Sequence, residues 1–295
     1  MTEPAILAVD LGTSGMKVAL ITVSGKVLDW ESEPVRLILT PDGGAEQSPQ
    51  EWWQAFLSAA GRMLKRNQDS ASSVIAVCAS TQGEGTVAVD KAGNAIGNAI
   101  LWMDMRGAPH LRKQLKGWIN NDGAGLANVL RFVRLTGGMP SMTGKDPAAH
   151  MLLVREAMPD VYRNTHKFLN VLDYINLRLT GECVATFDSI LTSWVTDNRN
   201  PDSIRYNDSL IRTLGVEREK LPDIVACTKV IGNLRGDVAN ALGLSSHVKV
   251  VAGAIDNTAA AIGAGTVADF ALHLYFGTSS WVAAHGPFKK TSIAS

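Results

Sequence analysis

The feature that most constrains the fold of this chain is a glycine-rich turn near the N-terminus that joins one strand to another strand. Residues 6–9 are apolar, and the turn that follows reads GTSG at residues 12–15. The period-two alternation of residues 16–23 predicts a second strand and not a helix. A Ser-Gly turn and residues 26–35 then predict a third strand. The chain therefore begins with consecutive strands joined by tight turns.

This arrangement excludes two common nucleotide-binding motifs. In a dinucleotide-binding fold GxGxxG opens a helix, and a P-loop reads GxxxxGK[ST]. The GTSG turn matches neither spacing and leads into a strand. The strand before it ends in Asp10, and burying such a carboxylate is costly unless a cation, a metal or a hydrogen-bonded ligand accompanies it. Because a hairpin follows Asp10, a helix-capping role is disfavoured, and we interpret Asp10 as functional.

The next part of the chain predicts an α/β fold. Residues 48–66 have the spacing of an amphipathic helix, with Ser48 as N-cap, Pro49 at the first helical position and Glu51 completing a capping box. Residues 72–81 predict a short buried strand. Strands, then a helix, then a strand indicate a mixed sheet. We also expect helices at residues 104–117, 146–158, 172–180 and 207–214, a hairpin over 86–102, and a loop-rich stretch over 117–144.

Composition excludes some function classes. Lys plus Arg equals Asp plus Glu at 28 each, which argues against a general nucleic-acid binder. The three cysteines are widely spaced without CxxC, which fits reduced thiols in a cytoplasm. The N-terminus lacks the pattern of a signal peptide, and no uncharged apolar run approaches the roughly 18–20 residues of a spanning helix. We expect a cytoplasmic protein with no nucleic-acid or membrane partner.

A second Gly-Thr-Ser turn, FGTSS at residues 276–280, follows another apolar strand and suggests a duplicated module. Glycine turns expose backbone N–H groups to phosphate oxygens, and the hydroxyls add donors. Asp256 follows a third buried strand, and the residues alone leave two readings open, a functional carboxylate or a helix N-cap. Phosphoryl transfer needs a phosphate cradle, a Mg²⁺ holder and a carboxylate that orients the attacking hydroxyl.

Six stretches in this order resemble the FGGY family of carbohydrate kinases, and its xylulokinase-like members most closely. They cover nearly the whole chain and are specific as a set. They are VDLGTSGMKV, EQSPQEWWQA, ILWMDMR, DYINLRLTGE, VVAGAIDNTAAAIGAG and FGTSS. The resemblance implies an actin-like, RNase H-like α/β fold with a mixed β-sheet flanked by helices and a cleft between two domains. It also implies ATP and Mg²⁺ as cosubstrates.

The resemblance assigns roles to individual residues. Asp10 helps to hold Mg²⁺, and Asp256 is the general base that takes the proton from the acceptor hydroxyl. The residues implied to bind the phosphates of ATP are Gly12, Thr13, Ser14, Lys17, Gly277 and Thr278. Those implied to contact the acceptor are Gln82, Glu84, Trp102, Asp104, Arg106, Asp256 and Asn257. For Glu84 a solvated turn residue, and for Trp102 a core position, remain the alternatives.

Two departures from the family pattern matter. His150 and Leu153 stand where members often carry a lysine and a tryptophan. Members also continue well beyond the position of Ser295, with an adenosine-binding glycine motif in that further part. We therefore expect residues 1–265 to be the sugar-binding N-terminal domain and residues 266–295 to be the start of an incomplete, truncated nucleotide-binding domain.

The expected function is ATP-dependent transfer of the γ-phosphate to a hydroxyl of a ketose or polyol, with D-xylulose or a related pentulose favoured. The alternatives are a glycerol-, erythritol- or gluconate-type kinase of the same family and a truncated, non-catalytic sugar-binding module. An actin-like structural ATPase is disfavoured, since it has no need of the polyol-binding side chains Glu84, Trp102 and Asp104. Oligomeric state stays open, with a homodimer as one alternative because dimers are common in the resembling family.

Overall fold

A six-stranded mixed β-sheet organises the chain. The computed structural model describes residues 3–118, 120–121, 123–276, 280–288 and 291. The strand order is β16-β17-β6-β1-β2-β3, in which β1, β6 and β17 run parallel and the other pairs are antiparallel. The strands are β1 (Ala5–Gly12), β2 (Gly15–Thr22), β3 (Val27–Pro34), β6 (Val74–Thr81), β16 (Val230–Asn233) and β17 (Lys249–Ile255). The predicted mixed sheet and its three consecutive N-terminal strands are confirmed.

The first hairpin follows from alternation and from one close backbone approach. Every second residue of β1, from Ala5 to Leu11, is buried. The register pairs Asp10 with Lys17 and Gly12 with Gly15, so Thr13 and Ser14 form the tip. A Cβ atom at Gly15 would lie 2.8 Å from the carbonyl oxygen of Glu33 on β3. The glycine therefore lets three strands pack closely beside the turn.

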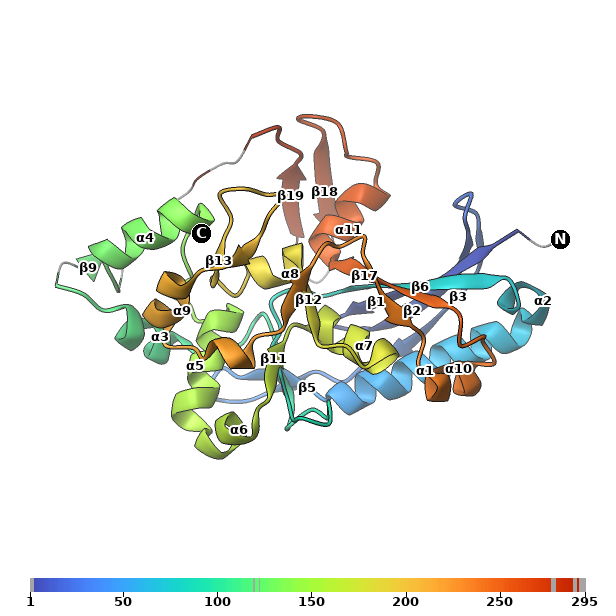
Figure 1. Cartoon of the computed structure of the whole chain (residues 1–295), viewed down its shortest axis with the longest axis horizontal. Helices are drawn as coiled ribbons and strands as arrows, with labels where there is room; N and C mark the ends of the chain where they lie inside the picture. The colour runs from blue at the N-terminus through green and yellow to red at the C-terminus, as the bar shows by residue number, and fades with distance from the viewer. Residues whose placement is uncertain (1–2, 119, 122, 277–279, 289–290, 292–295) are drawn as a thin grey trace.

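Helices α1 (Pro49–Arg66), α7 (Val171–Thr180) and α10 (Gly236–Leu242) cover one face of the sheet (Figure 1). The Ser48 side chain accepts a hydrogen bond from the Glu51 N–H, as the N-cap prediction requires. Trp52, Phe56 and Met63 of α1 are fully buried against the strands. Burying such large side chains stabilises the fold by about 1.5–3 kcal/mol each relative to exposure.

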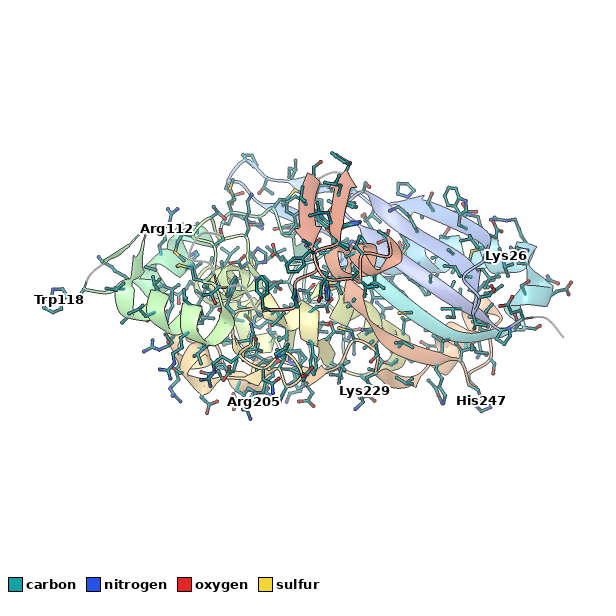
Figure 2. All side chains as sticks on the ribbon, turned by 90° about the horizontal axis from the view of Figure 1, so that it is seen from above. Lys26, Arg112, Trp118, Arg205, Lys229 and His247 are labelled. Carbon is teal, nitrogen blue, oxygen red and sulfur yellow. The ribbon has the colours of Figure 1, made fainter. Side chains whose placement is uncertain are left out.

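A second core lies beside the sheet and is mainly helical. It is built by α3 (Ala108–Leu115), α4 (Leu126–Thr136), α5 (Pro147–Ala157) and α9 (Asp208–Leu214). Figure 2 shows it from above at the Arg112 and Trp118 end, opposite the sheet. The helices predicted over residues 104–117, 146–158, 172–180 and 207–214 are confirmed as α3, α5, α7 and α9, within a few residues at their ends.

The loop-rich prediction for residues 117–144 is wrong in its middle. Residues 126–136 form α4, which buries Val129 and Phe132 and ends where Gly137 takes a φ of 93°. The glycine- and asparagine-rich flanks obscured a short apolar helical pattern in the sequence. The hairpin over 86–102 is reduced to two isolated bridges, Thr86 with Ile100 and Val89 with Ala95, because its strands pair elsewhere.

Short elements complete the described chain. They are β4 (Ile38–Leu39), β5 (Ala45–Gln47), α2 (Gln68–Ala71), β7 (Val87–Val89), β8 (Ala99–Ile100), β9 (Asn120–Asn121), β10 (Ala124–Gly125), α6 (Pro159–Asn164), β11 (Lys167–Leu169), β12 (Val184–Thr186), α8 (Phe187–Leu191), β13 (Thr196–Asp197), β14 (Arg205–Tyr206), the 3₁₀ turn Arg218–Lys220, β15 (Asp223–Val225), α11 (Asp256–Gly263), β18 (Leu272–Phe276) and β19 (Ser280–Ala284). The β18–β19 hairpin forms its own small sheet beyond α11. The helices of the described residues include none long and apolar enough to cross a membrane. The domain boundary at residue 265 stays a prediction.

Candidate active site

A cavity of about 250 Å³ lies where the carboxyl ends of β1, β6 and β17 meet the first turn. Nine of the predicted site residues line it: Gly12, Thr13, Ser14, Lys17, Gln82, Glu84, Trp102, Asp256 and Asn257. Gly83, Thr192, Ile255, Tyr275 and Trp281 complete the lining. Gly277 and Thr278 lie outside the described residues, so their predicted phosphate contact stays a prediction. Parallel strands thus bring residues far apart in the chain to one edge of the sheet.

Asp10 lies outside the lining of the cavity and faces Lys17, which lines it, across the first hairpin. Lys17 Nζ donates to Asp10 Oδ2 at 2.9 Å, and this hydrogen bond raises the pKa of Lys17. The Asp10 side chain is 42% exposed and the Lys17 side chain 61%, so this ion pair contributes little to the free energy of unfolding. Both groups therefore remain free to exchange partners with a phosphate or a cation.

The carboxylate of Asp10 fits a shared magnesium site better than a closed one. Mg²⁺ is usually held by one or two carboxylates together with waters and substrate phosphates. The described residues contain no group of three or more His, Cys, Asp or Glu side chains that would hold a metal by themselves. Asp10 is close enough to Asp256 for its charge to raise the pKa of Asp256. These two carboxylates, near the Thr13–Ser14 turn, suit a Mg²⁺ ion that binds together with the phosphates of a nucleotide.

Asp256 opens α11 directly after β17. Burial is the main cause that raises the pKa of this carboxyl group, and the charge of Asp10 adds to it. Ile255 stands at the N-cap position of α11 and Asp256 is the first residue of the helix, so Asp256 is not the N-cap. Its Oδ1 nevertheless accepts a hydrogen bond from the Asn257 N–H in the first turn at 2.9 Å. A half-buried carboxylate with a raised pKa is suited to accept a proton from a hydroxyl.

A closed ring of hydrogen bonds holds the Thr13–Ser14 turn. Thr13 Oγ1 donates to Gln82 Oε1 at 2.8 Å, and Gln82 Nε2 donates to Gln47 Oε1 at 2.9 Å. Gln47 Nε2 donates to the Thr13 carbonyl oxygen at 2.8 Å and closes the ring. Gln47 and Gln82 are buried, and Trp52 Nε1 also donates to Gln47. Gln82 thus positions the turn, and its direct contact with the acceptor stays a prediction.

Aromatic rings form one part of the cavity wall. The indole Nε1 of Trp102 donates to Thr13 Oγ1 at 3.1 Å while its ring lines the cavity. Tyr275 and Trp281, on β18 and β19, stack with their centroids 5.0 Å apart and also line it. Trp102 is half-buried at the cavity and is not a pure core residue. Aromatic faces of this kind suit the C–H groups of a sugar or polyol.

Glu84 is held in the left-handed region with φ of 59°, which is uncommon for a residue with a side chain. Its neighbour Gly85 packs so tightly that a Cβ atom there would lie 2.5 Å from Val171 Cγ2. Within the described residues the carboxylate of Glu84 has no hydrogen-bond donor. Burial and the charge of Asp256 raise its pKa, and Lys145 opposes them. Strained residues of this kind cluster at functional sites.

Asp146, which the sequence did not single out, lies behind Glu84. It stands at the N-cap position of α5 and is 5% exposed, yet its side chain makes no capping bond to that helix. Its Oδ2 accepts instead from the Ser141 N–H and from Trp194 Nε1, the latter at 3.0 Å. Burial is the main cause that raises the pKa of Asp146 to about 7, and the charge of Glu84 adds to it. Trp194 takes a φ of 58° two residues after Thr192, which lines the cavity.

The free energy of unfolding is expected to fall as pH rises from about 4 to about 7. In Asp146→Asn the decrease over this pH range is expected to be smaller by on the order of 1 kcal/mol. The folded protein retains the Asp146 proton up to about pH 7, whereas the unfolded chain loses it near 3.8, so stability from this group is lost in that window. Asp173, whose pKa burial also raises to about 7, leaves a residual slope. Urea unfolding at pH 5, 6, 7 and 8 measures this, with exposed Asp202→Asn as control. An unchanged slope in Asp146→Asn would contradict it.

Asp104 and Arg106 lie outside the cavity lining. Asp104 is fully buried, and its Oδ2 accepts from the Ala45 N–H at 2.9 Å. Arg106 Nη2 donates to Asp104 Oδ2 and to Glu46 Oε1, each at 2.6 Å. Through these hydrogen bonds the two side chains hold residues 104–106 against β5. Their predicted contact with the acceptor is not what this geometry favours. His150 is also buried, and its Nδ1 lies 3.1 Å from Thr86 Oγ1.

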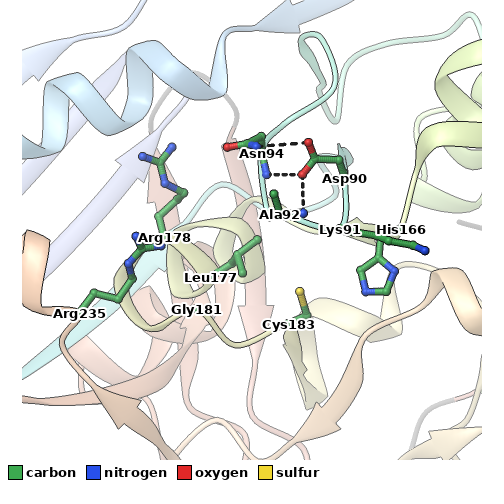
Figure 3. A pocket seen from close by; sticks show the side chains of 11 residues that line it. Asp90, Lys91, Ala92, Asn94, His166, Leu177, Arg178, Gly181, Cys183 and Arg235 are labelled. Carbon is green, nitrogen blue, oxygen red and sulfur yellow. Dashed lines mark hydrogen bonds between the residues drawn. The ribbon is translucent and has the colours of Figure 1, made fainter.

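A larger polar hollow of about 410 Å³ lies at the turn after β7 and contains none of the predicted residues (Figure 3). The Asp90 carboxylate there accepts hydrogen bonds from Ala92 N and from Asn94. Arg178 stacks on Trp53 at 4.6 Å. The guanidinium group of Arg235 forms an ion pair with Asp237. Asp90, Arg178 and Arg235 therefore already have structural partners.

Comparison with known proteins gives a consistent picture. The model of the N-terminal domain of the FGGY family of carbohydrate kinases matches residues 5–263. The xylulose kinase of Escherichia coli (strain K12) is 30% identical over 276 residues, which are 92% of this chain and 52% of that protein. The xylulose kinase of Bacillus subtilis (strain 168) is 27% identical over 275 residues, 93% of this chain and 52% of that protein. The chain thus spans about half the length of these curated relatives.

Solved structures share the fold. The xylulose kinase from Rhodospirillum rubrum superposes with a TM-score of 0.85 at 21% identity, over 98% of this chain and 56% of that one. The gluconate kinase from Lactobacillus acidophilus gives a TM-score of 0.82 at 24% identity, over 95% of this chain and 54% of that one. The predicted fold class is therefore confirmed.

Proposed function

This chain belongs to the FGGY family of carbohydrate kinases, and we propose that its cavity binds the acceptor in ATP-dependent phosphoryl transfer to a hydroxyl of a ketose or polyol. The observation that carries the proposal is that the Thr13–Ser14 turn, Glu84, Trp102 and Asp256 line one cavity. A phosphate-binding turn, an acceptor wall and a basic carboxylate are the parts that phosphoryl transfer requires.

In the proposed reaction each group of the chain has a separate task. The backbone N–H groups of Thr13 and Ser14 and the Ser14 hydroxyl donate to phosphate oxygens, while the Thr13 hydroxyl keeps its bond to Gln82. Lys17 can turn from Asp10 towards the same oxygens. Asp10 would hold Mg²⁺, which supplies charge neutralisation on the phosphates when bound. Asp256 accepts the proton of the attacking hydroxyl, so its oxygen becomes nucleophilic. As the bond from this oxygen to the γ-phosphorus forms, the bond from that phosphorus to the bridging oxygen breaks and ADP leaves. ATP and Mg²⁺ as cosubstrates are part of this proposal.

Among acceptors, D-xylulose or a related pentulose is our first choice. Relatives from two different bacteria that match over most of this chain are named xylulose kinases. A glycerol-, erythritol- or gluconate-type acceptor is the runner-up, because gluconate and glycerol kinases share the fold at comparable TM-scores of 0.82 and 0.80. We also propose that the protein is cytoplasmic and forms a homodimer.

A second candidate function is a non-catalytic sugar-binding module. It would use the acceptor wall of the cavity, with Glu84 and Trp102, without transferring phosphate. The two candidates make different predictions for the same protein. The kinase turns over ATP when an acceptor is present, whereas the module binds the acceptor without turnover.

A panel of pentuloses, erythritol, glycerol and gluconate, assayed for ADP release and by calorimetry, tests both candidates. Acceptor-dependent ADP release above the rate with ATP alone is the result expected for the kinase. Heat of acceptor binding without ADP release would favour the binding module. Absence of both binding and turnover across the panel would contradict the proposed acceptor cavity.

A further inference from the structure

We propose that Glu84 makes this cavity select uncharged polyhydroxy acceptors and reject sugar acids such as aldonates. The inference rests on the proposed function, because it concerns the acceptor bound in the same cavity. It goes further in naming the charge class of the acceptor and the residue that sets it. The runner-up acceptors above include one anion, gluconate, and this inference excludes it.

The acceptor wall of the cavity carries more negative than positive charge. Glu84 and Asp256 both line it and lie close enough for each charge to act on the other. The cation in the lining is Lys17, which belongs to the phosphate turn and already pairs with Asp10. A carboxylate on the acceptor would meet two carboxylates, and like charges in a partly buried site repel strongly.

Groups outside the lining do not reverse this balance. Asp146 lies behind Glu84 and feels its charge, so it adds negative potential whenever it is ionised. Lys145 is the cation whose charge reaches Glu84, and it is half-buried outside the lining. With Lys17 paired to Asp10, Lys145 is therefore the cation that opposes the charges of Asp256 and Asp146 at Glu84.

The hydrogen-bonding state of Glu84 points the same way. An ionised carboxylate only accepts hydrogen bonds, and within the described residues nothing donates to this one. A half-buried acceptor without a donor is costly until a ligand supplies one. Hydroxyl groups of a neutral polyol donate hydrogen bonds, whereas the carboxylate of an aldonate offers only further acceptors. The tight packing of Gly85 against Val171 keeps the Glu84 backbone in place for this contact.

Matched pairs of acceptors test the proposal by calorimetry on the 295-residue chain. The pairs are xylitol with D-xylonate and D-glucitol with D-gluconate, which differ only in a CH₂OH group replaced by a carboxylate. We expect the neutral member of at least one pair to bind about tenfold or more tightly than its acid. Glu84→Gln should narrow this ratio at least about fivefold, and Glu84→Asp, which keeps the charge, should retain it. Glu182→Gln, at an exposed glutamate outside the lining, is the matched control.

The outcomes distinguish a failure of the proposed role of Glu84 from a failure of the proposed acceptor site. Equal binding of the neutral member and its acid in both pairs, or an unchanged ratio in Glu84→Gln, overturns the role of Glu84 while leaving the acceptor cavity intact. No binding of any member overturns the proposed acceptor site and this inference with it. Thermal unfolding of each variant confirms that it is folded, and Glu84→Asp remains informative if Glu84→Gln is not.

Discussion

Asp256→Asn is expected to reduce phosphoryl transfer about 10²- to 10⁴-fold while acceptor affinity stays within about threefold. The amide oxygen of asparagine can still accept the hydrogen bond that Asp256 Oδ1 receives from the Asn257 N–H. The amide cannot, however, take a proton from the acceptor hydroxyl. Coupled ADP release measures the rate, and calorimetry with the acceptor measures the affinity.

The direction of the pH dependence supports the same test. Because burial raises the pKa of Asp256, the fraction of ionised base, and with it the rate, should rise with pH and then level off. Asp69→Asn, which makes the same chemical change at an exposed position, should leave rate and affinity unchanged. If Asp256→Asn retains a rate within tenfold of the unchanged protein, another group is the base.

Features that depend on neighbours in sequence could be predicted. Two such features are the alternation in residues 5–23 and the glycine pair around Thr13 and Ser14, which are local to one hairpin. The pairing of Asp10 with Lys17 follows from the register of that hairpin, although it was not predicted. The Ser48 cap and the helices that bury Trp52 and its neighbours follow from spacing in the same way. Asp256 was ambiguous because a residue at the start of a helix can cap it, and only the coordinates show that Ile255 stands at the N-cap position and Asp256 one residue further on.

Features that depend on distant partners could not be predicted. Gln47 is an ordinary residue before a helix until the fold places it against Gln82, 35 positions away. Asp146 and Trp194 are 48 positions apart, and nothing in either local pattern indicates their hydrogen bond. Such contacts depend on how strands and helices from separate parts of the chain pack together. The network that fixes the Thr13–Ser14 turn is therefore visible only in three dimensions.

The pair Asp104 and Arg106 shows how a motif can be recognised while the role of its residues stays a prediction. The W-x-D-x-R stretch places both residues near Trp102 in sequence, and Trp102 does line the cavity. Pairing of β8 with β5 brings Ala45 and Glu46 beside them, and these neighbours use the charges of the pair. A contact with the acceptor would compete with those bonds.

Arg106→Ala is expected to lower the unfolding free energy by about 3–5 kcal/mol, because it leaves a buried carboxylate without its cation. Asp104 is fully buried, and its partner Arg106 has a side chain only 13% exposed. The Asp104 carboxylate would keep its bonds from the Ala45 and Arg106 N–H groups but lose the guanidinium. Urea unfolding at fixed pH gives the difference in free energy.

The chain provides a matched control at the same sequence spacing. Arg199 pairs with Asp197 in the same way, but its side chain is 53% exposed, so Arg199→Ala should cost only about 1 kcal/mol. Removing both charges in Asp104→Asn with Arg106→Ala should recover part of the loss, since no unpaired charge then remains buried. If Arg106 instead contacts the acceptor, folded Arg106→Ala would lose acceptor affinity with little change in stability. That result would restore the assignment of Arg106 to the acceptor site and contradict the structural role argued from its bonds to Asp104 and Glu46.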